Sequence, residues 1–141
     1  MSFLDNLYKE IILEHYKRPR NRGELDGATV SRAGVNPSCG DELELFLNVS
    51  DGVVTDIKFI GEGCAISQAS TSMMTEAVKG KSVTEALALS QDFKAMLHGD
   101  GVADTLGDLK TLQGISKLYA RVKCAALPWV TLEGALAQES L

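Results

Sequence analysis

The sequence predicts an α+β fold, in which a small antiparallel three-stranded sheet has helices packed on one face. The first observation is a hairpin pattern over residues 42–60, where apolar and polar side chains alternate on both sides of the turn signal Asp51-Gly52. The second is that the flanking segments repeat apolar residues at three- and four-residue intervals, the period of a helix. A helix, then strands, then more helices is the element order typical of this class.

The N-terminal part is expected to supply one helix and one strand. Residues 3–16 are predicted to form an amphipathic helix, and Pro19 and Gly23 then end regular structure. The third strand is placed within residues 28–36. On the second strand of the hairpin, four residues are expected to share one face: Val53, Thr55, Ile57 and Phe59.

Helices are predicted over five segments after the hairpin: 65–79, 82–89, 92–97, 109–119 and 125–138. Gly80 ends the first of them, and Ser82 with Glu85 forms a capping box that begins the second. Residues 99–107 hold three glycines and are predicted to be a loop. Pro128 fits the last helix only within its first turn, where amide hydrogens have no helical partner.

Composition and charge exclude several classes of protein. The length of 141 residues favours one domain over residues 1–141, since domains span roughly 100–200 residues. With 45% hydrophobic and 23% charged residues, the chain is not of a disordered or low-complexity type. Its apolar runs fall short of the roughly 20 residues of a membrane span. Because the first residues also lack the pattern of a secretory signal, we expect a cytoplasmic protein with no membrane partner.

The net charge of −5 gives no overall attraction for nucleic acid, so no nucleic-acid partner is expected. The local exception is a basic loop over residues 17–22, which holds four cations: Lys17, Arg18, Arg20 and Arg22. Two interpretations of this loop remain open. It is either solvated surface or a docking site for an acidic partner protein.

The chain has three cysteines: Cys39, Cys64 and Cys124. An odd number cannot pair internally without a remainder, and in a reducing compartment thiols serve as buried packing, metal ligands or nucleophiles. Cys64 and Cys124 are each predicted just before a helix, where the positive end of the helix dipole favours the thiolate. Asp41 lies two residues after Cys39, and Gly40 between them allows both side chains to face one centre.

Three thiolates and one carboxylate are enough ligands for tetrahedral Zn²⁺, and the same set suits an iron–sulfur cluster. Asp41 is expected to be the weakest ligand, because oxygen is a poorer partner than sulfur for soft metals. The alternative is that each cysteine is a small core residue. The spacing of the cysteines matches no common zinc motif, so the residues alone leave both interpretations open. His15 and His98 are expected to close helices, with structural roles.

Three segments resemble the IscU-type iron–sulfur assembly family: Asn36-Pro-Ser-Cys-Gly-Asp41, Gly61-Glu-Gly-Cys-Ala-Ile-Ser-Gln-Ala-Ser70 and Arg121-Val-Lys-Cys124. The resemblance extends over nearly the whole chain, including the N-terminal helix and the basic loop. It implies the α+β fold of that family. It also implies a metal site formed by four residues: Cys39, Asp41, Cys64 and Cys124.

Three departures from the cluster-scaffold branch of that family point to its SufU branch, the zinc-containing sulfur acceptors of the SUF pathway. Lys123 stands where scaffolds carry a histidine before the third cysteine. Residues 117–121 replace the Leu-Pro-Pro-Val-Lys motif that a chaperone recognises in scaffolds. The interval between Cys64 and Cys124 is also longer, with the extra length expected between about Ser90 and Gly107.

The resemblance further implies partners and roles. A SufS-type cysteine desulfurase would supply persulfide sulfur, and downstream SUF cluster-assembly machinery would use it. Cys39 would accept the sulfur, and Arg121 would stabilise thiolate charge or contact the partner. The cofactor of this branch is Zn²⁺; the alternative function is a scaffold that assembles a [2Fe–2S] cluster on the same four residues.

Overall fold

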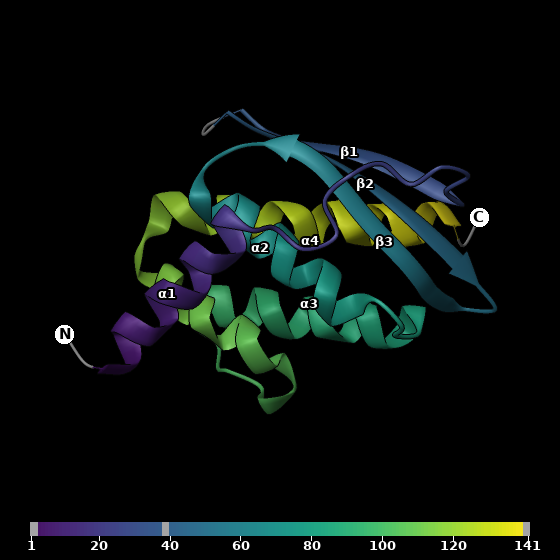
Figure 1. Ribbon diagram of the computed structural model, residues 1–141. Helices are drawn as coiled ribbons and strands as arrows, with labels where there is room; N and C mark the ends of the chain where they lie inside the picture. Colours follow the sequence, from purple (N-terminus) through teal and green to yellow (C-terminus); the bar gives the residue numbers. More distant parts are fainter. Residues whose placement is uncertain (1–2, 38–39, 140–141) are drawn as a thin grey trace.

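The computed structural model describes residues 3–37 and 40–139. Its elements follow in this order: α1 (Phe3–Lys17), β1 (Val30–Asn36), β2 (Asp41–Ser50), β3 (Val53–Glu62), α2 (Ala65–Val78), α3 (Val83–Leu97), the 3₁₀ segment η1 (Asp104–Lys117) and α4 (Tyr119–Glu139). The three strands pair antiparallel in the order β1-β2-β3, and the helices gather on one side of this sheet (Figure 1). The predicted fold class is confirmed.

The hairpin buries one face of the sheet. In β2, Leu45 and Leu47 are fully buried, as the alternation predicts. A bulge at Asn48 and Val49 then leaves Thr55 without a partner in the pairing of β2 with β3. Because of this extra residue, Val54 is buried and Thr55 is exposed at the start of β3, so the prediction that Thr55 shares the face of Ile57 and Phe59 is wrong.

The core lies between the sheet and the helices beneath it. Helix α4 packs against β1 and β2, α2 packs against β3 and α4, and α1 lies on the outer side of α2. Trp129 of α4 is fully buried and stacks on Phe93 of α3, with ring centroids 4.8 Å apart. Trp129 and the pair Met73-Met74 are therefore core residues. Within the described chain, the helices lack the combination of length and apolar composition that a membrane crossing needs.

Helix α3 runs without interruption where two short helices were predicted. Ser82 caps it through the expected capping box with Glu85. The predicted break near residue 90 does not occur, because Ser90 is buried and donates a 2.8 Å hydrogen bond to Glu133 of α4. A serine that finds a tertiary partner no longer competes for the helix backbone, so the helix continues.

The predicted loop covers residues 99–103 only, and the segment that follows, η1, is a 3₁₀ helix and not the predicted α-helix. Its buried apolar residues recur every third position: Leu106, Leu109, Leu112 and Ile115. Three residues per turn is the period of a 3₁₀ helix, so this spacing buries one stripe. Gly107 interrupts the segment with φ of 55° and ψ of −127°.

Helix α4 begins at Tyr119, six residues before the predicted start, and contains Pro128 in its interior. Pro128 cannot donate the helical hydrogen bond that would reach the carbonyl of Cys124. The neighbouring Ala125 carbonyl accepts a 2.7 Å hydrogen bond from Ser70 Oγ of α2, which is a side-chain contact between the two helices in this turn. The prediction that Pro128 lies in the first turn of its helix is wrong, because α4 begins earlier and continues through the proline.

Candidate metal centre

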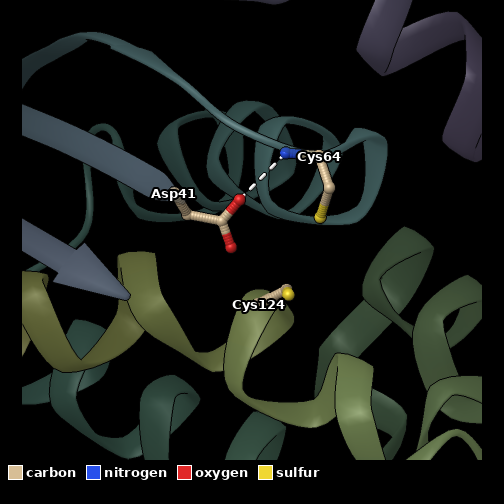
Figure 2. A group of neighbouring side chains, drawn as sticks. All are labelled: Asp41, Cys64 and Cys124. Carbon is tan, nitrogen blue, oxygen red and sulfur yellow. Dashed lines mark hydrogen bonds between the residues drawn. The ribbon is translucent and has the colours of Figure 1, made fainter. Parts of the chain in front are cut away.

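Asp41, Cys64 and Cys124 meet at one end of the sheet (Figure 2). Asp41 is the first residue of β2, Cys64 is the N-cap of α2, and Cys124 lies inside α4. One ligand atom from each residue lies within 4.8 Å of those from the other two. Asp41 and Cys124 are buried, with 1% and 0% of their surface exposed, and Cys64 is partly exposed.

Two glycines allow the turn before α2 to bring Cys64 against Asp41. A side chain at Gly61, whose φ is 153°, would collide with the backbone carbonyl of Glu42. At Gly63, a Cβ atom would lie 2.5 Å from Asp41 Oδ1 and 2.5 Å from Ser67 Oγ. The Gly-Glu-Gly turn is therefore closely packed against the carboxylate, and this packing fixes where Cys64 enters the site.

Three donors hold the buried carboxylate of Asp41. Its Oδ1 accepts hydrogen bonds from the Cys64 backbone N–H at 2.9 Å and from Ser67 Oγ at 3.2 Å. Its Oδ2 accepts a longer one, 3.5 Å, from Asn36 Nδ2. A buried carboxylate without donors is costly, so these contacts explain how Asp41 is accommodated and orient its oxygen atoms.

The two sulfur atoms lie in different surroundings. Cys64 Sγ accepts a 3.5 Å hydrogen bond from the Ser67 backbone N–H, as an N-cap side chain does, so this thiol lies at the positive end of α2. Cys124 Sγ accepts a 3.8 Å hydrogen bond from Asn36 Nδ2. Cys124 is within α4 and does not precede it, so the predicted helix-start position of this thiol is wrong.

Asn36 and Ser67 contact this group and were not among the predicted site residues. Asn36 is 7% exposed and is the last β1 residue paired with β2, directly opposite Asp41. Ser67 is 3% exposed and follows Cys64 by three residues. The contact of Ser67 with Cys64 could have been predicted, because an N-cap side chain bonds the residue three positions later. The contact of Asn36 with Cys124 depends on how α4 docks and has no local signal.

The donor set fits a tetrahedral thiophilic metal. Two sulfurs and a carboxylate already lie within 4.8 Å of one another, and a tetrahedral zinc site has sulfur ligands at about 2.3 Å from the ion. Cys39, the expected fourth ligand, lies outside the described residues. Arg121 is exposed near the start of α4, three residues before Cys124.

Both histidines lie outside this group and stabilise helices. His15 is buried between α1 and α2, where Nδ1 is 2.8 Å from Ser72 Oγ. Burial, followed by the charge of Arg20, lowers the pKa of His15, while Glu76 opposes this effect. His98 caps α3, with Nδ1 2.7 Å from the Lys94 carbonyl. The structural roles expected for both are consistent with these contacts.

In this α+β fold, a strand carboxylate and two helix thiols lie close enough to share one metal ion. This arrangement is typical of thiolate metal-binding proteins. The chain belongs to the family of NifU-like N-terminal domains, whose model matches residues 7–125. This finding confirms the resemblance to the IscU-type assembly family.

Two relatives and one solved structure show how far the similarity extends. The chain is 48% identical to the zinc-dependent sulfurtransferase SufU of Bacillus subtilis, with 99% of this chain and 97% of the relative covered. It is 41% identical to the iron–sulfur cluster assembly scaffold protein IscU of Streptococcus pyogenes, covering 96% and 86%. A crystal structure of a SUF-system scaffold protein from Fervidobacterium islandicum superimposes with a TM-score of 0.87 at 38% identity, covering 90% and 94%.

Proposed function

We propose that this protein takes persulfide sulfur from a cysteine desulfurase and delivers it for iron–sulfur cluster assembly, as a zinc-dependent sulfur acceptor. The observation that carries the proposal is the buried group of Asp41, Cys64 and Cys124. It occurs in a chain that is similar over nearly its full length to a zinc-dependent sulfurtransferase. The finer assignments follow from the same similarity: a SufS-type desulfurase as donor, downstream SUF machinery as recipient, the cytoplasm as compartment and one domain over residues 1–141.

Four residues are proposed to hold the metal: Cys39, Asp41, Cys64 and Cys124. When bound, zinc keeps its thiolate ligands deprotonated and shields them from oxidation. Asp41 is the oxygen ligand of the set, and its donors on Cys64, Ser67 and Asn36 retain the carboxylate in place. The family resemblance favours Cys39 as the ligand that leaves for reaction.

The proposed reaction moves one sulfane sulfur between thiols. The Cys39 thiolate attacks the outer sulfur of the desulfurase persulfide. A new sulfur–sulfur bond forms on Cys39, the bond in the donor persulfide breaks, and the desulfurase cysteine leaves as a thiolate. The terminal sulfur keeps its proton as it moves to Cys39, and the sum of oxidation states is unchanged. No oxidant or reductant is therefore needed. Arg121, exposed near Cys124, is the proposed contact for the partner or for thiolate charge.

The second candidate function is a scaffold on which a [2Fe–2S] cluster is assembled, and the similarity to the streptococcal IscU favours it. Lys123 is the residue that argues against it, because an ammonium group cannot ligate iron. It stands where the scaffold branch carries a histidine, and its side chain is exposed.

The test combines metal analysis with sulfur transfer. The protein, purified without added metal, is expected to contain zinc, and the Asp41→Ala variant is expected to retain it less well. Incubation with a SufS-type desulfurase and cysteine should show stimulated turnover, which Cys39→Ala abolishes while the protein stays folded. Stimulation at the wild-type level in Cys39→Ala would refute the assigned acceptor. Iron with acid-labile sulfide in place of zinc would favour the scaffold.

A further inference from the structure

Residues 20–23, which we term the strap, tie the basic loop to the two elements that flank Cys64. The Phe59 N–H donates to the Asn21 carbonyl at 3.0 Å, and the Gly23 N–H donates to the Phe59 carbonyl at 2.8 Å. The strap thus adds a short parallel bridge to the outer edge of β3. On α2, Ser72 Oγ accepts from the Arg20 N–H at 2.8 Å, and Asn21 Nδ2 donates to Thr75 Oγ1 at 3.0 Å.

Arg22 extends from the strap across the turn that carries Cys64. Its Nη2 donates to the Gly61 carbonyl at 3.0 Å, at the start of the turn, and its Nη1 donates to Gln68 Oε1 at 3.2 Å, after the turn. The guanidinium also lies over the Phe59 ring, 5.8 Å from the centroid. One planar cation therefore connects the end of β3 to the first turns of α2, on both sides of Cys64.

The turn is held from two sides. On the inner side, Asp41 accepts from the Cys64 N–H and packs against Gly63. On the outer side, Arg22 binds the Gly61 carbonyl. A proposed metal ligand supplies the inner contacts, so they depend on whether the metal is bound. The contacts of Arg22 are independent of the metal.

We propose that Arg22 is a positioning residue of the metal centre: it keeps Cys64 in place through contacts that do not involve the metal ligands. The inference rests on the proposed metal-dependent function. It also assigns a role to part of the basic loop, because the guanidinium of Arg22 is bound within the chain. The cations before it have other contacts: Arg18 and Arg20 both pair with Glu14, at 2.9 and 3.6 Å.

Two substitutions and one matched control test the inference. Arg22→Gln removes the cation and both hydrogen bonds, and Arg22→Lys keeps the charge but cannot span two acceptors. Arg18→Gln removes an equal charge from the same loop but lies outside the contacts of the turn. The first measurement is the rate of zinc release into an excess of a chromophoric chelator. The second is hydrogen exchange of the Cys64 amide.

We expect Arg22→Gln to accelerate zinc release about tenfold, the lower limit for residues that support metal ligands. Arg22→Lys should lie between it and the wild type, and Arg18→Gln should match the wild type. Exchange of the Cys64 amide should accelerate in the same order, while amides elsewhere in β3 keep their rates. Equal release from Arg22→Gln and Arg18→Gln would overturn the inference, and so would a uniform acceleration of exchange across β3 and α2.

If Arg22→Gln does not fold, Arg22→Lys decides the question by the same two measurements. A wild-type protein that holds no zinc would contradict the proposed function. The exchange rate of the Cys64 amide would still show whether Arg22 fixes the turn, so the two failures are distinguishable.

Discussion

Adding one methyl group at Gly63 should disturb the metal centre without removing any ligand. The Cβ of Gly63→Ala would lie 2.5 Å from Asp41 Oδ1, whereas ordinary contact begins at 3.4 Å. The carboxylate must therefore move by roughly 0.9 Å, or the turn must move away from it. Either movement weakens the hydrogen bonds from the Cys64 N–H and Ser67 Oγ to Asp41.

The size of the effect follows from this geometry. Overpacking of a buried site costs about 1–3 kcal/mol of unfolding free energy, which corresponds to a fall in Tm of roughly 4–10 °C for a chain of this size. Displacing a ligand from its hydrogen-bonding partners lowers metal affinity by about 10–100-fold. Thermal unfolding and competition with a chelator measure the two effects separately.

Gly114→Ala is the matched control, since a Cβ at Gly114 meets nothing within 4 Å. Both substitutions reduce the freedom of the unfolded chain equally, so their difference isolates the contact with Asp41. The reasoning is refuted if Gly63→Ala and Gly114→Ala give proteins with the same Tm and the same zinc affinity.

Two further predictions concern His15 and Asn36. Because burial and Arg20 lower the pKa of His15, the unfolded chain takes up this proton first, near its ordinary pKa of 6.5, and unfolding free energy should fall as pH drops below that value. Tm measured between about pH 8 and pH 5 should decline less steeply in His15→Gln, and an identical slope would count against the assignment. Asn36→Leu removes the amide that contacts Asp41 and Cys124, so zinc release should accelerate about tenfold in a chelator assay. Release at the wild-type rate would mean that the amide does not support the bound metal.

Elements whose patterns depend on local spacing were predictable from the sequence. The hairpin and α2 were found because alternation and helical periodicity coincide with glycine turns at their ends. The 3₁₀ segment η1 carried a signal in its three-residue apolar spacing, but that spacing is also part of a helical pattern. The start of α4 was missed because proline is expected in the first turn of a helix, whereas α4 continues through Pro128.

The candidate site likewise has one part that local sequence predicts and another that depends on how distant elements pack. The proximity of Asp41 to the Cys64 turn follows from the end of a hairpin, where Glu42 pairs with Glu62. Which thiol joins them depends on how deeply α4 docks beneath the sheet. Spacing along the chain gives no measure of that docking, so the residues alone left Cys124 open as a ligand or a core residue, and the family resemblance favoured the ligand. Arg22 was recognised as basic, but its acceptors come from two other elements.

The distribution of the site along the chain has a consequence for protein synthesis. Asp41 and Cys124 are separated by more than half of the sequence, and α4, which carries Cys124, follows all the other described helices along the chain. Contacts between such distant residues form only after the long intervening loop has closed. A nascent chain that stops before Cys124 would lack one thiol of the proposed site. In the proposed site, metal would therefore be held only after α4 has joined the sheet, so metal retention would report on the docking of that helix.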